Sequence, residues 1–567
     1  MAAFLFHSTL RSTSFRAGCC LILAAAFWGA PAAAAEPPRI YAITHATVIP
    51  EPGRRIDAGT VVIRDGLIES VGTGLPVPDD AVEINGSGKW VYPGLIDADS
   101  QLGLPAPGPP PGTGAPPFAR PRPETPAGAI HDIARIHPET RAQDQLRPFE
   151  GDRKRDVERL RELGFTTAVV TPEKGLLRGK SVAIDLVVDR PVAQIILRED
   201  VAQNAAFERG RFGEGYPTSL MGAVAALRQT LLDAERHAAW AKRYADHPEG
   251  MRRPEHHAAY EALAPVLDRE QPVVFHTEDP RDTLLADALG REFDLDVLVS
   301  TSSYEWERAP EIAATGRGLI VSAGFPDKPE VEEDDEALDV SRDEMRRYLD
   351  AAGGPARLHE AGVTFAFTLH GLKNTADLPR QMRKITEAGL PESDVLAAWT
   401  TIPAQFLGLD RMVGRLAPGA IANVLVANGA LFAEKTKIVT VFVDGIKHQV
   451  KQKKKPEGDP DAIVDPRGDW SVTMDFGGRA IQRQWTVKGR PGAYAGTAET
   501  QRGTVSFESV ELAGNVLTVA FPARGGRPRM EITVIIRGDH FKGTAEMGPR
   551  SVKIQGTRTS GPEGGNR

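Results

Sequence analysis

The feature that most constrains this fold is an alternation of helical and apolar strand-like segments between about residues 153 and 370. The strand-like segments are 166–170, 272–276, 297–300, 319–321 and 365–368, and each follows a segment with helical periodicity. Strands that are apolar on both faces are typical of a parallel sheet covered by helices. With roughly 300 residues available from about 93 to 410, the pattern predicts a (β/α)8 barrel, and a doubly wound sheet is the alternative.

Strand-like segments flank this region on both sides. Residues 42–44, 60–63 and 67–72 precede it, with Arg64-Asp65-Gly66 as a hairpin turn, and residues 422–427 and 439–445 follow it. From about residue 467 only strand-like segments remain, at 470–472, 482–487, 503–508, 516–521, 530–536 and 552–554. Short strands at spacings near 8–12 residues with Gly-rich turns predict a small antiparallel barrel.

The first 35 residues have the pattern of an export signal. Two arginines precede the apolar run 19–30, and Ala33-Ala34-Ala35 offers a cleavage site before Glu36. The run is short for a transmembrane helix, so a cleaved signal is favoured over an uncleaved membrane anchor. We therefore expect a periplasmic or secreted protein.

Composition excludes several classes of chemistry. The net charge of -8 gives no reason to expect nucleic acid as a partner, and the lysines between 447 and 455 stand beside Pro and Gly as in a solvated linker. The two cysteines, Cys19 and Cys20, lie inside the predicted signal, so the mature chain would have no disulfide, thiol nucleophile or thiolate metal site. No Gly-x-Ser-x-Gly elbow is present, which argues against a serine hydrolase.

Several segments together resemble the amidohydrolase superfamily. Pro93-Gly94-Leu95-Ile96-Asp97 is similar to its first-barrel-strand signature, and residues 402–426, with Ile402-Pro403-Ala404 and Gly414-Arg415-Leu416, are similar to its return into a small β-domain. The resemblance covers about residues 41–445. The tail with Trp470 near its start is similar to lipocalin-like β-barrels.

The residue patterns and the resemblance together predict five parts. We expect a signal peptide at 1–35; a composite β-sandwich from 36–92 and 411–450; a (β/α)8 barrel at 93–410 with a Pro-rich loop at 104–128; a charged linker at 451–466; and a β-barrel at 467–567.

Family members hold one or two divalent metal ions at the carboxyl ends of the barrel strands, and this sequence departs from their ligand set. The His-x-His pair of strand 1 falls on Asp99 and Gln101, the strand-5 histidine is kept as His276, and the strand-6 end is Ser300-Thr301-Ser302. His370 stands where the family has an Asp on strand 8.

Two interpretations of these changes remain open. In the first, Asp99, His276 and His370 form a non-standard site for one ion, Zn²⁺ above others, with Glu278 or Asp279 as an additional ligand. Asp99 and His370 would then be catalytic, and the His370 imidazole is an alternative general base. In the second, the ligands were lost because metal is no longer needed.

The first interpretation predicts an exported hydrolase acting on a carbon–nitrogen bond of a small-molecule or small peptide-like substrate. The second predicts a catalytically inactive binding protein that uses the same barrel mouth, paired with an active amidohydrolase. The fold is compatible with both functions, because fold alone does not decide function. The resemblance to the family favours the enzyme and the changed ligands favour the binding protein; we favour the enzyme.

Overall fold

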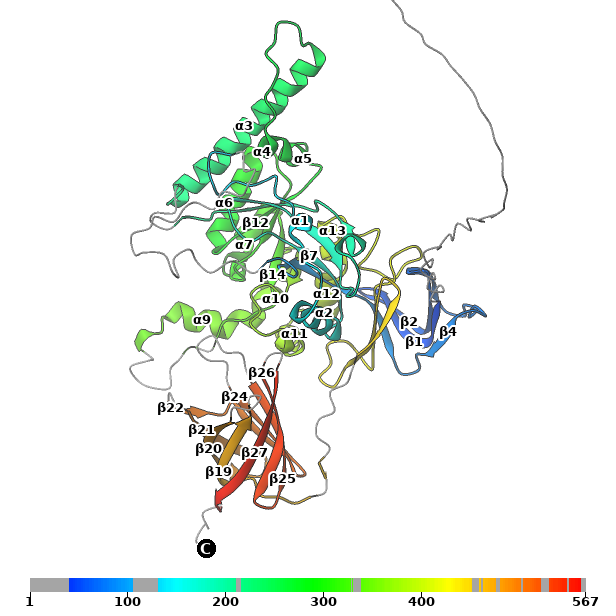
Figure 1. Ribbon diagram of the computed structural model, residues 1–567, viewed down its shortest axis with the longest axis vertical. Helices are drawn as coiled ribbons and strands as arrows, with labels where there is room; N and C mark the ends of the chain where they lie inside the picture. The colour runs from blue at the N-terminus through cyan, green and yellow to red at the C-terminus, as the bar shows by residue number, and fades with distance from the viewer. Residues whose placement is uncertain are drawn as a thin grey trace, which may run out of the picture. The chain divides into compact units, whose positions relative to one another are not determined.

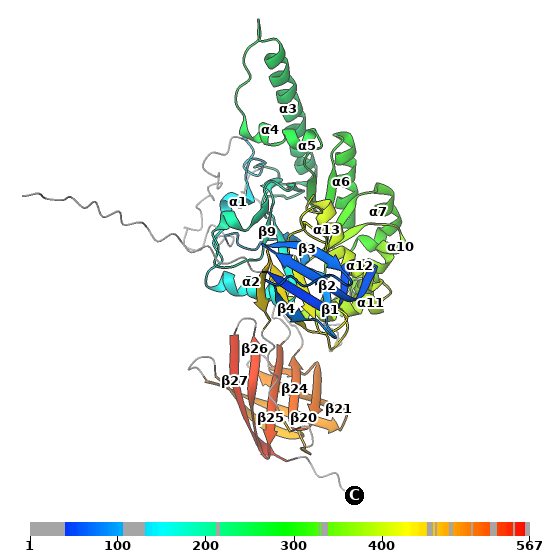
Figure 2. The same ribbon diagram turned by 90° about the vertical axis from the view of Figure 1, so that its right-hand side faces the viewer.

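The computed structural model describes residues 40–105, 131–210, 216–327, 329, 338–450, 458–459, 462–475, 480–500, 503–521, 530–547 and 550–561 (Figures 1 and 2). The predicted export signal, nearly all of the Pro-rich loop and most of the charged linker lie outside these residues, so they stay predictions. No helix in the described ranges is both long and apolar enough to cross a membrane.

Both flanks of the central region meet in one eight-stranded sheet. Its strand order is β18-β17-β16-β5-β1-β2-β3, with β4 paired to β1. The strands are β1 Tyr41–Glu51, β2 Arg54–Arg64, β3 Leu67–Gly72, β4 Val82–Asn85, β5 Trp90–Pro93, β16 Val424–Ala427, β17 Ile438–Val443 and β18 Ile446–Gln449. Because β5 pairs antiparallel with β16, segments more than 300 residues apart in the chain are joined next to the signature Pro93-Gly94.

The central strands form two mixed sheets. One has the order β10-β9-β7-β6 and the other β15-β14-β13-β12-β11-β8. Their bounds are β6 Leu95–Ser100, β7 Phe165–Val170, β8 Leu177–Lys180, β9 Val182–Asp185, β10 Ile196–Arg198, β11 Gln203–Ala206, β12 Val273–His276, β13 Val297–Ser300, β14 Gly318–Ser322 and β15 Phe365–Thr368.

The predicted parallel order holds for part of this region. Strands β11 to β15 are parallel neighbours, as are β6 and β7, whereas β8, β9 and β10 pair antiparallel. A parallel neighbour needs a long crossover, usually a helix. Between β7 and β11 the chain contains no α-helix, so these short strands return directly as antiparallel partners.

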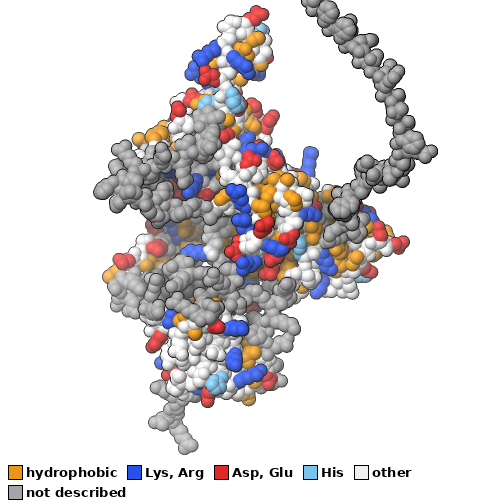
Figure 3. Space-filling model, in the orientation of Figure 1, with side chains coloured by type: hydrophobic (Ala, Val, Ile, Leu, Met, Phe, Trp, Pro, Cys, Tyr) orange, Lys and Arg blue, Asp and Glu red, His pale blue; other side chains and the backbone are white. Residues whose placement is uncertain are grey.

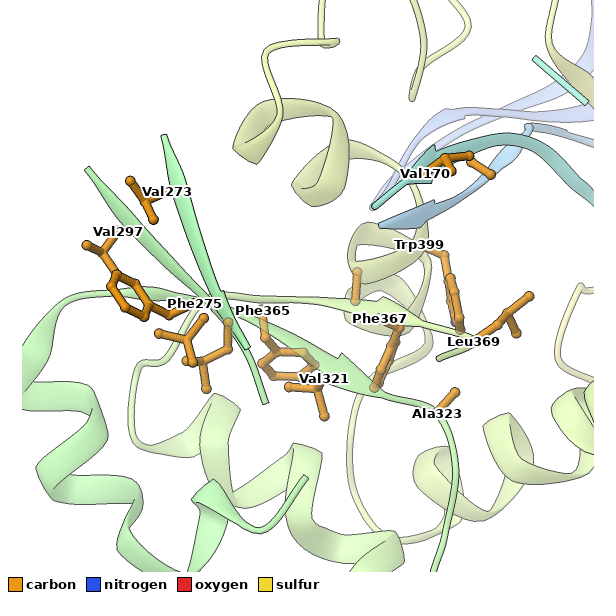
Figure 4. Packing of buried hydrophobic residues seen from close by; sticks show 14 of the residues in the cluster. Val170, Val273, Phe275, Val297, Val321, Ala323, Phe365, Phe367, Leu369 and Trp399 are labelled. Atoms are coloured by element: carbon orange, nitrogen blue, oxygen red, sulfur yellow. The ribbon is translucent and has the colours of Figure 1, made fainter. Parts of the chain in front are cut away.

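Helices cover the apolar strands. They are α1 Ala142–Gln145, α2 Asp152–Glu162, α3 Leu220–Asp246, α4 Ala258–Ala262, α5 Ala264–Leu267, α6 Pro280–Glu292, α7 Ala309–Thr315, α9 Arg342–Asp350, α10 Gly354–Glu360, α11 Leu378–Glu387, α12 Glu392–Trp399 and α13 Thr401–Phe406. Figure 4 shows Phe365 and Phe367 of β15, with Trp399 beside Phe367. The Phe367 and Trp399 ring centroids lie 5.4 Å apart, and Trp399 also contacts Phe165 at 5.1 Å, so this buried indole joins α12 to strands of both sheets.

The tail forms a closed eight-stranded antiparallel barrel. Pairing between β20 and β21 closes the ring, and β22 is attached to β21. The strands are β19 Gly468–Asp475, β20 Ala480–Arg490, β21 Ala493–Thr500, β22 Gly503–Ser506, β23 Ser509–Ala513, β24 Val516–Phe521, β25 Met530–Arg537, β26 His540–Met547 and β27 Arg550–Ser560. The sequence prediction missed β21, β23 and β26. Trp470, Trp485 and Phe541 are fully buried and in ring contact, so aromatic side chains occupy this part of the barrel interior.

Candidate active site

Asp99 lies at the carboxyl end of β6 and joins two other strand ends. Its Oδ2 accepts a hydrogen bond from Ser300 Oγ at 2.7 Å and lies 3.4 Å from His276 Nδ1. The three residues come from β6, β13 and β12, and Asp99 and Ser300 are buried. The structure therefore brings together Asp99 and His276, as the sequence predicted, and adds Ser300.

Asn204 determines which nitrogen of His276 faces Asp99. The Asn204 Nδ2 donates to the carbonyl oxygens of Gly179 and Ala202, so its Oδ1 is the atom 3.2 Å from His276 Nε2. Because Oδ1 is only an acceptor, His276 Nε2 carries a proton. A neutral His276 then presents the lone pair of Nδ1 to the Asp99 carboxylate. The contact between Nδ1 and the carboxylate is favourable only if a positive charge is present there. Either protonation of Nδ1 or a bound metal ion would supply it.

The electrostatics keep Asp99 ionised. Burial alone would raise the pKa of Asp99, but the charge of His276 and its hydrogen bond, together with His370 and Ser300, hold that pKa well below its ordinary value. Burial lowers the pKa of His276, and the adjacent Asp99 carboxylate opposes this effect. A carboxylate that stays charged in a buried site needs a positively charged neighbour.

Asp97, two residues before Asp99 on β6, has a different role. Its Oδ1 accepts bonds from Thr368 Oγ1 at 2.7 Å and from the Leu369 amide at 3.0 Å. Thr368 Oγ1 also lies 2.7 Å from the Asp99 carbonyl oxygen. Burial raises the pKa of Asp97 to about 6, despite these hydrogen bonds. Asp97 thus connects β6 to β15 through side-chain hydrogen bonds. These two strands belong to different sheets and are not paired with each other.

His370 reaches the same end of the strands by another route. Its amide donates to Thr368 Oγ1 at 3.0 Å, and its carbonyl oxygen accepts from Ser322 Oγ at 2.5 Å. The residue is exposed, and its side chain acts on Asp99 and His276 through its charge. The structure places the imidazole near the pair, without a direct side-chain contact to either residue.

The proposed additional ligands are not brought to the pair. Asp279 caps α6, with Oδ1 accepting from the Arg281 amide at 2.8 Å, and Glu278 is exposed. Within the described ranges, no group of three or more His, Cys, Asp or Glu side chains is arranged to hold a metal ion.

Two of the predicted ligands nevertheless fit one ion. Ligand atoms bonded at about 2.0–2.1 Å to one tetrahedral Zn²⁺ lie about 3.3 Å apart, close to the 3.4 Å between Asp99 Oδ2 and His276 Nδ1. A hydrogen bond from the second ring nitrogen to an oxygen acceptor is also what orients metal-binding histidines. Asn204 supplies that acceptor, so the donor set fits a metal ion at these two residues. His370 would complete the set only after moving.

Lys180, the last residue of β8, lies away from this site. Lys180 pairs in register with Gln203, at the first residue of β11, whereas His276 pairs with Ala206 at the last. Lys180 Nζ lies 3.6 Å from Asp200 Oδ2. Lys180 therefore stands at the opposite end of β11 from His276.

Sequence reasoning missed Asn204, Ser300 as a partner of Asp99, and Asp97 as the link to β15. Asp97 belongs to the signature segment, which could have marked it. Asn204 and Ser300 are small polar residues within or at the end of apolar strands, and only the register of neighbouring strands shows what they contact.

A family model and several solved structures are similar to parts of this chain. The amidohydrolase family matches residues 329–447, which include His370. An amidohydrolase structure from Thermotoga maritima MSB8 is 21% identical, with a TM-score of 0.57, over 72% of this chain and 99% of that one. The family match and this structure confirm the predicted resemblance to amidohydrolases, and the latter shows the fold.

Two further structures are less similar. A Xaa-Pro dipeptidase with methionine bound in its active site is 15% identical, with a TM-score of 0.40, over 72% of this chain and 100% of that one. A β-aspartyl dipeptidase from Fervidobacterium islandicum AW-1 is 14% identical, with a TM-score of 0.39, over 74% and 99%. No curated protein sequence matches this one.

Proposed function

We propose that this chain is an exported amidohydrolase-type hydrolase. It would use a (β/α)8-type barrel and a non-standard single metal site at Asp99, His276 and His370 to cleave a carbon–nitrogen bond. The observation that carries the proposal is the orientation of His276: Asn204 holds its Nε2, which leaves Nδ1 facing Asp99 at ligand spacing.

Each residue has a separate task in this proposal. Asp99 and His276 hold the ion, and Ser300 keeps the Asp99 carboxylate in place through the 2.7 Å bond to Oδ2. A Zn²⁺ ion bound there would lower the pKa of a water molecule and polarise a carbonyl group. His370, exposed at the strand ends, would accept a proton from the attacking water or complete the ligand set.

Export is the second part of the proposal. It rests on the apolar run and the Ala33-Ala34-Ala35 segment, which predict a mature chain beginning at Glu36. Amino-terminal sequencing of the protein from the periplasm or medium of an expressing bacterium tests it. A chain recovered only in the membrane with its first residues intact would contradict it.

Elemental analysis of the purified mature protein tests the metal site. We expect one zinc or similar divalent ion per chain, lost in Asp99→Ala and in His276→Ala but kept in His359→Ala. His359 is a matched control because it is an exposed histidine on α10, with Nε2 3.8 Å from Asp394. The three variants and the wild type are also assayed on a panel of acylated amino acids, cyclic amides and dipeptides.

The alternative function is that of a binding protein, and one observation favours it. Asp99, His276, Ser300 and Asn204 already satisfy one another if His276 is doubly protonated, so the site is stable without an ion. In that case the wild type would contain no stoichiometric metal, a chelator would not change its stability, and no substrate of the panel would be cleaved. Co-purification with an active amidohydrolase would then identify its partner.

A further inference from the structure

Arg178 stands beside the residue that orients His276. It lies on β8, between Leu177, which pairs with Ala205, and Gly179, which pairs with Asn204. The Gly179 carbonyl oxygen accepts from Asn204 Nδ2 at 3.0 Å. Arg178 is therefore one residue away from the hydrogen bonds that hold Asn204, and through it His276, in position.

The Arg178 guanidinium is largely enclosed but poorly hydrogen-bonded. Its side chain is 15% exposed. Among the described residues, its hydrogen bond is the long one from Nε to the Gly175 carbonyl oxygen at 3.4 Å, and Nη2 lies 3.8 Å from Glu208 Oε2. A guanidinium offers five N–H donors, so the terminal nitrogens of Arg178 keep most of their capacity.

Glu208 does not account for Arg178 as a structural ion pair. Glu208 Oε1 already accepts from Arg135 Nη1 at 2.5 Å, and Oε2 accepts from the Gly175 amide at 2.8 Å. Both oxygens therefore have closer partners than Arg178. The guanidinium contributes charge to this cluster without forming the paired hydrogen bonds typical of an arginine–carboxylate contact.

A structural arginine of similar exposure looks different in this protein. Arg317 is 18% exposed, and its Nε donates to Asp287 Oδ1 at 2.8 Å while Nη1 donates to the Leu295 carbonyl oxygen at 3.1 Å. The contrast shows that the terminal nitrogens of Arg178, unlike those of Arg317, are not committed to a hydrogen-bond partner within the described residues.

The surroundings of Arg178 connect it to the candidate active site. Burial lowers the pKa of Arg178, while Glu208, Asp99, Glu173 and Glu278 oppose that effect through their charges. The charge of Arg178 in turn acts on His276. Arg178 is thus the cation on the β8 side of the Asp99–His276 pair.

We propose that Arg178 binds a carboxylate of the substrate. A planar guanidinium forms two parallel hydrogen bonds with a carboxylate, and it discriminates strongly against the uncharged analogue. The substrates would then be carbon–nitrogen compounds with a free carboxylate, such as acylated amino acids or short peptides. This inference rests on the proposed function for the identity of the bond cleaved, but the binding it predicts is measurable without turnover.

The test compares N-acetylglycine with N-acetylglycinamide, which differ in the carboxylate. Binding to the purified mature protein is measured by calorimetry or by ligand-observed NMR. We expect the wild type to bind N-acetylglycine more tightly than the amide, and Arg178→Gln to lose about tenfold or more of that affinity. Arg178→Lys should keep part of the preference, because it keeps the charge but not the fork of donors.

Arg269→Gln is the control variant. Arg269 is an exposed arginine paired with Asp294 at 2.8 Å, just before β12 and away from its carboxyl end, and it should bind both probes as the wild type does. Thermal unfolding tests whether each variant is folded. If Arg178→Gln is not folded, the comparison is made with Arg178→Lys. Equal affinity of the wild type for both probes, no binding of either, or an Arg178→Gln variant that keeps the preference would overturn the inference.

The outcome is separable from that of the proposed function. A protein that binds N-acetylglycine through Arg178 but cleaves nothing supports this inference and contradicts the hydrolase. A hydrolase whose Arg178→Gln variant still prefers the carboxylate probe contradicts this inference alone.

Discussion

Replacing Asp185 by Asn should make the stability of this protein less sensitive to alkaline pH. Asp185 is a buried carboxyl at the end of β9, and its Oδ1 accepts from Asn423 Nδ2 at 2.7 Å and from Thr167 Oγ1 at 3.5 Å. Burial raises the pKa of Asp185 to about 7, and the nearby Asp444 carboxylate adds to the effect, while the Asn423 bond and Arg190 oppose it.

The sign follows from the direction of the shift. The folded state binds the Asp185 proton more tightly than the unfolded state, whose carboxyl has a pKa of about 3.9. The stability that this group contributes is therefore complete below about pH 4 and is lost as the pH rises through 7. Compared with a permanently neutral side chain at this position, the ionisable carboxyl lowers the free energy of unfolding by about 1.5 kcal/mol near pH 5 and by about 4 kcal/mol near pH 8.5.

Asp185→Asn keeps the size of the side chain and an oxygen that accepts from Asn423, but it cannot ionise. We expect the difference in unfolding free energy between variant and wild type to grow in favour of the variant by about 2.5 kcal/mol from pH 5 to pH 8.5. Urea denaturation at the two pH values measures it. Asp294→Asn, at an exposed carboxylate paired with Arg269, is the control and should show a constant difference.

The reasoning would be refuted if the difference in unfolding free energy did not change with pH, or if Asp185→Asn became less stable relative to the wild type at pH 8.5. Either result would mean that the buried carboxyl is ionised at no cost in the folded state.

Three further substitutions test separate parts of the structure. Gly94→Ala would place a Cβ 2.1 Å from Thr166 Oγ1, so it should cost about 1–3 kcal/mol by overpacking in thermal unfolding, and Thr166→Gly should relieve that loss. Phe541→Ala removes a fully buried ring packed against two tryptophans and should destabilise the C-terminal barrel by about 3–5 kcal/mol; an unchanged barrel transition would contradict this. Asn204→Leu removes the acceptor of His276 Nε2 and should weaken zinc affinity about 10–100-fold in a competition titration, whereas unchanged affinity would show that Asn204 does not orient the ligand.

The sequence was most informative where one pattern is repeated. Five apolar strand-like segments with intervening helical periodicity predicted β7 and β12 to β15, because a strand buried on both faces needs apolar residues throughout. Pro93-Gly94 was recognised as a signature, and the structure supplies its reason: Thr166 of β7 leaves no room for a Cβ at position 94. The resemblance implied a composite β-sandwich built from the strands on both sides of this region, and in the structure β5 pairs with β16 within one eight-stranded sheet.

The antiparallel strands β8 to β10 were not predicted, because short strands such as Leu177–Lys180 have no periodicity that separates them from loops. The same limit explains the missed strands of the tail. Alternation over a few residues does not show which neighbouring segment will pair with them. A short segment becomes a strand only when its backbone hydrogen-bonds to such a neighbour.

The sequence by itself, through its resemblance to amidohydrolases, marked Asp99, His276 and His370 as the residues that stand at the family's ligand positions at the strand ends. Only the tertiary structure decided how they are used. Whether His276 Nδ1 faces Asp99 depends on the hydrogen bond that His276 Nε2 donates to Asn204 Oδ1, 72 residues earlier in the chain. The position of Arg178 depends on how β8 pairs with β11. Distances between side chains on different strands are set by register and packing, and neither is encoded in the spacing of residues along the chain.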